Sequence, residues 1–251
     1  MTLVVPARAK LNLDLAVLSR TDDGYHEVRT HIQAVALHDL LELKRADRTT
    51  MTTTGPHRID PDDNSVRKAQ QALEAIAGRE LPTAFHLDKR IPPGSGMGGA
   101  SSDAAVALRG LAAVHNLRAD LSQVAMGIGA DVPFFLNGGA ALAEGRGERI
   151  TAMWTEPAWF AIAWPDIELS TAMVYSAWDE VHGDGPNQLR DGAEHVEPRL
   201  RDFAARLGDA WQMTGSGSAF FLRCPDERSA RDAVVEVDGW TAVTHSVGPW
   251  A

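Results

Sequence analysis

The amino-acid sequence predicts an α+β fold that is divided into two domains. Its 251 residues suffice for one large domain or for two of ordinary size, and either arrangement can bury a sizeable core. Stretches with the apolar patterns of strands and of helices alternate along the whole chain, which favours a mixed architecture. The character of the sequence changes after Thr151. We therefore expect an N-terminal domain over residues 1–152 and a C-terminal domain over residues 153–251.

The strand predictions rest on short apolar runs, some of which alternate with polar residues. In the first domain these runs cover residues 3–5, 11–18, 27–35, 40–43 and 85–87, and residues 138–150 follow as a strand, a glycine-rich turn and a second strand edge. In the second domain the runs cover residues 159–164, 212–213, 219–222 and 240–247.

The helix predictions rest on apolar residues at helical spacing and on capping residues. The predicted helices cover residues 66–77, 104–114, 121–126, 170–178, 198–207 and 229–237. Asn64 or Ser65 is expected to cap the first of them, and Ser101, Ser102 or Asp103 the second. Asp131 precedes apolar residues and a proline, a pattern that is also common at a helix start.

Acidic residues outnumber basic residues, with 34 Asp and Glu against 24 Lys and Arg, for a formal net charge of −10. This balance argues against nucleic acid or an anionic membrane as the main partner, although it leaves room for a local basic site. An anionic small substrate would therefore have to be bound by local N–H groups and a few cations.

The single cysteine, Cys224, excludes an internal disulfide and a cysteine-based zinc site. The first residues lack a basic stretch followed by a long apolar core, and no apolar run approaches the ~20 residues that span a bilayer. We therefore expect a cytoplasmic protein without a membrane partner, and leave open whether it is a monomer or a homodimer.

A glycine-rich stretch over residues 91–105 joins a predicted strand to a predicted helix. Its four glycines let the backbone turn with positive φ and let an oxyanion approach the N–H groups closely. The start of the following helix adds free N–H groups and the positive end of the helix dipole. The stretch has neither the lysine of a Walker A loop nor the acidic partner of a dinucleotide fingerprint. It predicts a third kind of phosphate-binding loop, with a plain strand-to-helix connection as the alternative.

Two further positions suggest chemistry, and each also has a structural alternative. Lys10 and Asn12 are two residues apart on a predicted strand, so their side chains point to the same face. A lysine on a strand is more often simply solvated. Asp131 precedes an apolar run that contains a proline, and a helix cap is the structural alternative at this position.

Five motifs taken together resemble the GHMP kinase superfamily. In chain order they are Pro6-Ala7-Arg8-Ala9-Lys10-Leu11-Asn12-Leu13, Asp23-Gly24-Tyr25-His26-Glu27, the loop from Pro92 to Ala105, Gly129-Ala130-Asp131-Val132-Pro133-Phe134-Phe135, and Gly215-Ser216-Gly217. The resemblance extends over about residues 6–247. It implies the two-domain GHMP kinase fold, with a first domain like domain 2 of ribosomal protein S5 and a ferredoxin-like second domain.

The resemblance also implies ATP-dependent transfer of a phosphoryl group to a small alcohol, with Lys10 and Asp131 as the catalytic residues. Asp131 would accept the proton of the attacking hydroxyl, and Lys10 would keep that carboxylate ionised. The implied ATP-binding residues are Asn64, Lys89, Pro92, Gly94, Ser95, Gly96, Met97, Gly98, Gly99, Ala100, Ser101 and Ser102. Ser102 is the candidate contact for Mg²⁺ or the β-phosphate. Asn64 could equally be a helix cap, and Lys89 a solvated lysine.

The first, second and fourth motifs narrow the implied acceptor to a methylerythritol linked to cytidine diphosphate, which is phosphorylated on its 2-hydroxyl in the non-mevalonate isoprenoid pathway. The only two tyrosines, Tyr25 and Tyr175, fall where the family places rings about the cytosine. Stacking of this kind contributes roughly 1–3 kcal/mol per base. His26 would contact the cytosine and Asn12 the erythritol end, and Thr171 belongs to the same implied set. The alternative for Tyr175 is a core position.

The sequence departs from the family pattern at two places. Ala100 stands where a third consecutive glycine is usual, and it would be strained if that position needs a positive φ. Asn187-Gln188-Leu189-Arg190 replaces a more acidic stretch. The alternatives are therefore another GHMP kinase acting on a different small alcohol, or an inactive nucleotide-binding relative. An inactive relative would be expected to lose Lys10 or Asp131, and both are present.

Overall fold

The computed structural model describes residues 1–22 and 24–250 and divides the chain into two compact units. Unit 1 comprises residues 1–9, 38–91 and 98–137, and unit 2 comprises residues 10–37, 92–97 and 138–251. The chain thus passes several times from one unit to the other. The predicted boundary between residues 152 and 153 lies inside unit 2 and stays a prediction. Asp23, which belongs to one of the motifs, lies outside the described residues.

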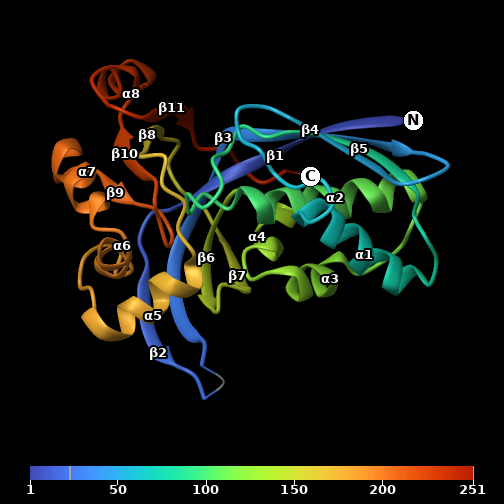
Figure 1. Cartoon of the computed structure of the whole chain (residues 1–251), viewed down its shortest axis with the longest axis horizontal. Coiled ribbons are helices and arrows are strands. Elements are labelled where there is room, and N and C mark those ends of the chain that lie inside the picture. The colour runs from blue at the N-terminus through green and yellow to red at the C-terminus, as the bar shows by residue number, and fades with distance from the viewer. Residues whose placement is uncertain (23, 251) are drawn as a thin grey trace. The chain divides into compact units, whose positions relative to one another are not determined.

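Unit 1 packs helices against a small group of strands (Figure 1). Its strands are β4 (Thr50–Thr54), β5 (Thr83–Asp88) and the second part of β3 (His26–Arg45), in the order β4-β5-β3. β5 runs parallel to β4 and antiparallel to β3. The helices are α1 (Ser65–Ala77), α2 (Gly99–His115), α3 (Leu121–Ile128) and α4 (Val132–Asn137). The apolar face of the strands is buried, for example at Leu41, Leu43, Phe85 and Leu87.

Unit 2 contains two groups of antiparallel strands. In the first, β2 (Ala16–Arg20) and β6 (Ala140–Gly145) pair with the first part of β3, and β7 (Arg149–Met153) pairs with β6. The second is a sheet in the order β11-β8-β10-β9, formed by β8 (Trp159–Trp164), β9 (Gln212–Met213), β10 (Phe220–Cys224) and β11 (Trp240–His245). β1 (Thr2–Asn12) also pairs with β3, and both strands run through the two units.

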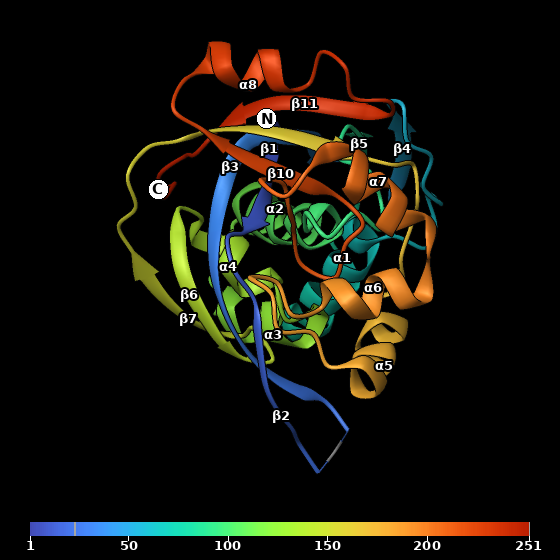
Figure 2. The same cartoon turned by 90° about the vertical axis from the view of Figure 1, so that its left-hand side faces the viewer.

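The helices of unit 2 are α5 (Thr171–Val181), α6 (Arg190–Val196), α7 (Arg199–Leu207) and α8 (Glu227–Ala233). Figure 2 shows α5, α6 and α7 following one another along one flank of this unit. Their apolar side chains, among them Val174, Leu200 and Phe203, pack with Phe220 of β10 into one core. None of the helices in residues 1–22 and 24–250 is long and apolar enough to cross a membrane.

The predicted α+β class is confirmed, and the main differences concern element boundaries. The runs predicted at 27–35 and 40–43 belong to one continuous strand of 20 residues, β3. The prediction of one strand over residues 11–18 is wrong, because β1 ends at Asn12 and β2 begins at Ala16. β4 and α6 were not predicted.

The start of α2 is the most informative correction, because α2 begins at Gly99 rather than at residue 104. Ser101, Ser102 and Asp103 therefore lie inside the helix, and Gly98 takes the capping position with φ of 72°. No side chain caps this helix start. Its first N–H groups are thus left to other acceptors, which suits an anion.

Candidate functional site

The unit 2 part of the glycine-rich loop, residues 92–97, is held by a second glycine-containing turn at residues 214–218. The N–H of Ala219 donates to the carbonyl of Ser95 at 3.0 Å, and the N–H of Ser218 donates to the carbonyl of Gly94 at 3.3 Å. Gly94 and Gly96 have φ of 59° and 78°, and a Cβ on Gly96 would meet the carbonyl oxygen of Thr214. These contacts explain why glycines are needed at both positions.

The other predicted residues of this part are buried or tied back to the chain. Ser95 Oγ donates to the carbonyl of Pro92 at 2.6 Å, so this hydroxyl supports the turn from within. Met97 is fully buried, and its carbonyl accepts the N–H of Lys10 at 3.0 Å. The backbone of the loop is therefore fixed next to β1, the strand that carries Lys10.

The unit 1 part of the loop is the uncapped start of α2. Ala100 and Ser101 lie in its first turn, and Ala100 has no positive φ, so the strain considered for an alanine at this position does not arise. Ser102 is fully buried, and its Oγ has no hydrogen-bond partner among the described residues. A buried hydroxyl normally finds a partner. The free N–H groups thus fit a phosphate. The orphaned Oγ of Ser102 fits either a phosphate oxygen or the metal ion that accompanies the phosphate.

Lys10 and Asn12 form a buried polar group on β1, which confirms that they share one face of the strand. Lys10 Nζ donates to Asn12 Oδ1. Asn12 Nδ2 donates to Thr30 Oγ1 at 2.8 Å, and the N–H of Asn12 donates to Thr214 Oγ1 at 2.8 Å. The exposed fractions of Lys10, Asn12 and Thr30 are 3%, 4% and 3%. The prediction of a solvated lysine is therefore wrong, and a buried ammonium calls for functional explanation.

His26 lies in an aromatic group formed with α5. Its ring stacks on Tyr175 with centroids 5.0 Å apart and an interplanar angle of 22°, and it meets Trp178 edge-on at 5.7 Å. His26 Nε2 is 2.6 Å from Asp179 Oδ1, which orients the imidazole. Tyr175 is half-buried and also packs against the core of unit 2, so the core alternative holds in part.

Tyr25, the second tyrosine, is 57% exposed and precedes His26 directly. The guanidinium carbon of Arg146 lies 3.9 Å from the centroid of its ring. Thr171, at the start of α5, is exposed, and its Oγ1 is 2.9 Å from Oγ of Ser216 in the second glycine-containing turn. All five predicted acceptor-binding residues therefore belong to unit 2, and four of them make contacts within it that tie β1, β3, α5 and this turn together.

Asp131 belongs to unit 1 and stands immediately before α4. It is half-buried, and the neighbouring N–H of Val132 donates to the carbonyl of Gly129 at 3.1 Å. This tight turn between α3 and α4 fixes the backbone that carries the carboxylate. The residue is thus held at the start of a short helix.

Asn64 is the N-cap of α1, as one of its two interpretations predicts. Its Oδ1 accepts from the N–H groups of Val66 and Arg67, and its Nδ2 donates to the carbonyls of Asp60 and Pro61. The capping function accounts for its burial. The implied contact with the adenosine part of ATP is not tested by these bonds and stays a prediction.

Lys89 is buried rather than solvated, and it is paired with two carboxylates. Its Nζ donates to Asp39 Oδ2 and, at 2.9 Å, to Asp103 Oδ2. Burial opposes the charge of Lys89, but the two carboxylates outweigh it and raise the pKa of the ammonium. Burial raises the pKa of Asp103 to about 7, although Lys89 acts in the opposite direction.

No group of three His, Cys, Asp or Glu side chains that could hold a metal ion occurs in the part of the chain that the structure describes. Mg²⁺ in kinases is commonly held by one or two protein groups together with the phosphates of the nucleotide. The buried Oγ of Ser102 is compatible with that arrangement.

The sequence analysis did not identify three residues that contact the predicted site residues: Asp39, Thr214 and Asp179. Asp39 is fully buried in β3 and is paired with Lys89, 50 positions away along the chain. A carboxylate inside the apolar run of residues 34–43 was the one signal that could have drawn attention to it. Thr214 and Asp179 act through partners that are also remote in sequence, and neither pairing has a local pattern.

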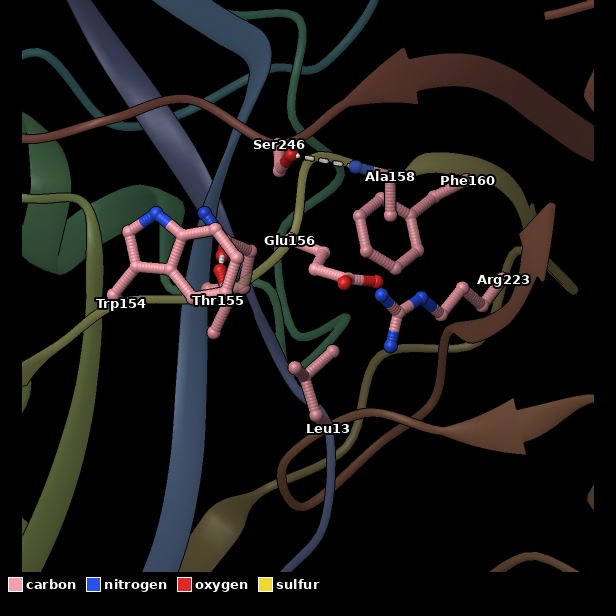
Figure 3. Close-up of a pocket in the computed structure, with 9 residues that line it drawn as sticks. Leu13, Trp154, Thr155, Glu156, Ala158, Phe160, Arg223 and Ser246 are labelled. Atoms are coloured by element: carbon pink, nitrogen blue, oxygen red, sulfur yellow. Dashed lines mark hydrogen bonds between the residues drawn. The ribbon is translucent and has the colours of Figure 1, made fainter. Parts of the chain in front are cut away.

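A separate cavity of about 290 Å³ lies in unit 2 (Figure 3). Its walls include Leu13, Trp154, Phe160 and the charged side chains of Glu156 and Arg223, which point toward one another. None of the predicted site residues is among those that line it. Because the two charged side chains face each other, neither is directed at a bound ligand, and the lining does not indicate which kind of ligand the cavity would bind.

Comparison with known proteins places these features in a family. Residues 64–139 match the model of the GHMP kinases N terminal domain. A 4-diphosphocytidyl-2-C-methyl-D-erythritol kinase of Pseudomonas syringae pv. tomato is 37% identical over 246 residues, covering 91% of this chain and 87% of the relative. The enzyme of that name from Halorhodospira halophila is 34% identical, covering 94% of this chain and 89% of the relative.

Solved structures agree with the sequence relatives. A crystal structure of 4-(cytidine 5'-diphospho)-2C-methyl-D-erythritol kinase matches with a TM-score of 0.83 at 30% identity, covering 98% of this chain and all of that chain. A homoserine kinase from Cytophaga hutchinsonii matches with a TM-score of 0.65 at 17% identity, covering 99% of this chain and 95% of that chain, which shows the shared fold alone. The chain is a GHMP kinase and belongs to the family of the 4-diphosphocytidyl-2-C-methyl-D-erythritol kinases.

Proposed function

We propose that this protein transfers the γ-phosphoryl group of ATP to the 2-hydroxyl of 4-diphosphocytidyl-2-C-methyl-D-erythritol, a step of the non-mevalonate isoprenoid pathway. The observation that carries the proposal is the set of contacts among the acceptor residues of unit 2. Lys10 and Asn12 form a buried polar group on β1, and Tyr175 stacks on His26. A polar site for an alcohol and a stacking site for a base are the two features that this acceptor requires.

The acceptor is recognised at two places that differ in chemistry. Tyr25 and Tyr175 would stack on the cytosine, and His26, oriented by Asp179, would offer its remaining ring nitrogen to the polar edge of the base. Asn12 and Thr171 would contact the erythritol end. Binding energy from the cytidine diphosphate would then hold the hydroxyl in place, which matters because the 2-hydroxyl is tertiary and crowded.

Asp131 is the proposed general base. The hydroxyl oxygen attacks the γ-phosphorus and forms the new P–O bond, while the bond to the bridging oxygen breaks and ADP leaves. The hydroxyl proton goes to Asp131. Lys10 is the proposed catalytic cation, since a buried ammonium offsets the negative charge of the reacting groups.

The donor would be held by N–H groups along residues 94–101. Ser102 would contact the Mg²⁺ ion, which neutralises phosphate charge when bound. Asn64 and Lys89 are the remaining proposed ATP-binding residues.

We also propose that the protein acts in the cytoplasm, where ATP is available, and that it works as a monomer or a homodimer without nucleic acid or membrane partners.

Substitution of the base tests the mechanism. Asp131→Asn is expected to lower kcat by at least about 100-fold, since general-base catalysis commonly contributes 10² to 10⁴, with little change in the KM for ATP. Asp120→Asn is the matched control, because Asp120 caps α3 through its Oδ1 and asparagine caps equally well. An Asp131→Asn variant with the kcat of the wild type would exclude Asp131 as the base.

A further inference from the structure

A cluster of buried charges lies in unit 1 beside the glycine-rich loop. It consists of Asp39 on β3, Lys89 immediately after β5, and Asp103 on α2, and we call it the Asp39–Lys89–Asp103 cluster. The exposed fractions of the three residues are 0%, 3% and 1%. The residues that flank the unit 2 part of the loop (92–97) on either side, Ile91 and Gly98, belong to the same unit as the cluster, and we call them the two ends of the loop.

Asp39 holds the chain just before the loop by using both of its carboxylate oxygens. Its Oδ2 accepts from Lys89 Nζ, while its Oδ1 accepts from the N–H groups of Arg90 at 2.6 Å and Ile91 at 2.8 Å. Three consecutive residues are therefore fixed by one side chain. A carboxylate that receives several N–H groups makes strong, directional bonds.

Lys89 connects this segment to the helix that follows the loop. Its Nζ donates to Asp103 Oδ2 at 2.9 Å, and Asp103 lies in the second turn of α2. A Cβ added to Gly99, the first residue of α2, would lie 2.9 Å from Lys89 Nζ and 3.1 Å from Ile91 Cγ2. The start of the helix thus packs directly on the residues that precede the loop.

Stability alone does not explain such a cluster. Burying charged groups costs free energy that pairing recovers only in part, and apolar residues of similar volume often give equal or greater stability. A network of buried charges does, however, specify one arrangement of the elements that it joins. Here those elements are the two ends of the glycine-rich loop.

We propose that the Asp39–Lys89–Asp103 cluster sets the separation of the two ends of the loop and thereby its affinity for ATP, so that Asp39 is a positioning residue that acts through Lys89 and the segment before the loop. This inference rests on the proposed function, in which the loop binds the ATP phosphates. A phosphate-binding loop gains affinity when its N–H groups are held in the bound geometry beforehand. The cluster supplies that restraint from outside the loop.

Two isosteric substitutions, Asp39→Asn and Asp103→Asn, test whether the cluster positions the loop or only fills space in the core. In Asp39→Asn, only one of the two carboxylate oxygens remains an acceptor. If that oxygen accepts from Lys89, the new NH₂ group faces the backbone N–H groups of Arg90 and Ile91. If it accepts from those N–H groups, the NH₂ group faces the ammonium of Lys89, so a donor opposes a donor in either case. In Asp103→Asn, the oxygen can still accept from Lys89, because Asp103 Oδ1 has no partner among the described residues. Asp39→Asn is therefore expected to raise the Kd for Mg·ATP about tenfold or more, the factor that 1.4 kcal/mol represents. Asp103→Asn is expected to raise it by less.

The readout is the Kd for Mg·ATP from calorimetry, together with steady-state kcat and KM, measured well below the unfolding temperature of each variant. Asp39→Asn should raise the KM for ATP in parallel with the Kd and leave the KM for the alcohol acceptor within about twofold, a split that a merely structural role would not produce. Asp120→Asn, the same chemical change at a helix cap in unit 1, should leave both constants unchanged.

The outcomes separate this inference from the proposed function. Wild-type protein that binds ATP but does not phosphorylate the acceptor would refute the proposed substrate, while the Kd values of the variants would still test the cluster. A folded Asp39→Asn variant with the wild-type Kd would overturn the inference, and so would wild-type protein that does not bind ATP. If Asp39→Asn does not fold, Asp103→Ala replaces it: it must raise the Kd more than Asp103→Asn does, and equal values would overturn the inference.

Discussion

At the scale of single residues, burial and hydrogen bonding distinguish residues that stabilise the fold from residues that are available to a ligand. Every polar side-chain atom of Asn64 has a partner within unit 1, since Oδ1 caps α1 and Nδ2 binds two carbonyls. Ser102 is the opposite case, because its buried Oγ has no partner among the described residues. The first residue is explained by the fold, whereas the second is better explained by a ligand.

Asn64→Ala should therefore lower the free energy of unfolding by about 1 kcal/mol, the usual value of an N-cap. Asn64→Asp should restore only part of that loss, because its Oδ1 can still cap α1 while its second oxygen faces the carbonyls of Asp60 and Pro61 without a donor. Chemical denaturation of the three proteins measures both effects. The KM for ATP, measured on the same variants, tests the predicted adenosine contact: it should rise in both variants if the amide binds the nucleotide. An Asn64→Ala variant as stable as the wild type would contradict the capping role.

The glycine at position 96 gives a second residue-scale prediction. Gly96→Ala should abolish tight ATP binding, because its φ is 78° and its Cβ would meet the carbonyl of Thr214. Gly127→Ala is the control: a Cβ there meets nothing within 4 Å, and alanine in the helix should stabilise the protein by up to about 1 kcal/mol. Calorimetric titration with Mg·ATP and thermal unfolding check the pair. Normal ATP binding by Gly96→Ala would contradict the close approach of the two turns.

Tyr175 leads to a prediction about the acceptor. Tyr175→Ala should raise the KM for the cytidylated acceptor about tenfold, since stacking on a base contributes roughly 1–3 kcal/mol. Tyr175→Phe keeps the ring and should retain most of the affinity. Steady-state kinetics with varied acceptor at saturating ATP measure this difference. If the alanine and phenylalanine variants have equal KM values, the ring does not stack on the base.

At the scale of elements, α2 is anchored at its C-terminal end as well as at its start. His115, in the last turn of α2, is 5% exposed, and its Nε2 is 2.8 Å from Oγ1 of Thr83 on β5. Burial, followed by the charges of Arg45 and Arg79, lowers the pKa of His115 below its ordinary value of 6.5. The neutral imidazole is therefore the form that the folded protein prefers.

The sign of the resulting pH dependence follows from linkage. The unfolded chain binds a proton at this histidine below about pH 6.5, whereas the folded protein resists it, so the stability contributed by His115 is present above that pH. It is lost as the pH falls through the folded pKa. His115→Gln should therefore reduce the drop in Tm between pH 7.5 and pH 5. An unchanged drop in Tm for His115→Gln would contradict the depressed pKa.

The elements differ in how far their sequences predict them. The capped helix α1 and the shared face of Lys10 and Asn12 follow from local patterns, and the structure confirms both. β4 is an edge strand without a buried face, so its threonine-rich sequence has no apolar alternation to detect. α6 has only seven residues and contains a glycine, which packs against the backbone of α5. Its formation depends on that tertiary contact.

The charged positions show the same limit within the site. The resemblance to the GHMP kinase superfamily implied Lys89 as a residue of the ATP site, but nothing local predicts that Asp39 and Asp103 surround it. Pairings between residues 50 positions apart are decided by the fold. A sequence analysis can therefore identify candidate residues, while their protonation and partners require the three-dimensional structure.

At the scale of the whole molecule, an acidic chain with a net charge of −10 is proposed to bind two anionic substrates. The structure shows how local features can offset that charge: an uncapped helix start, a glycine-rich loop and a buried lysine. The agreement with relatives extends over 91% of the chain, and so over both units.

The most direct test is an ATP-consumption assay with Mg²⁺ that compares two acceptors. One is 4-diphosphocytidyl-2-C-methyl-D-erythritol, and the other is the same alcohol without the cytidine diphosphate. We expect ADP to form only with the cytidylated acceptor, because stacking on the base supplies the binding energy that positions the hydroxyl. Equal rates with both alcohols, or no turnover with either by a protein that binds ATP, would contradict the account.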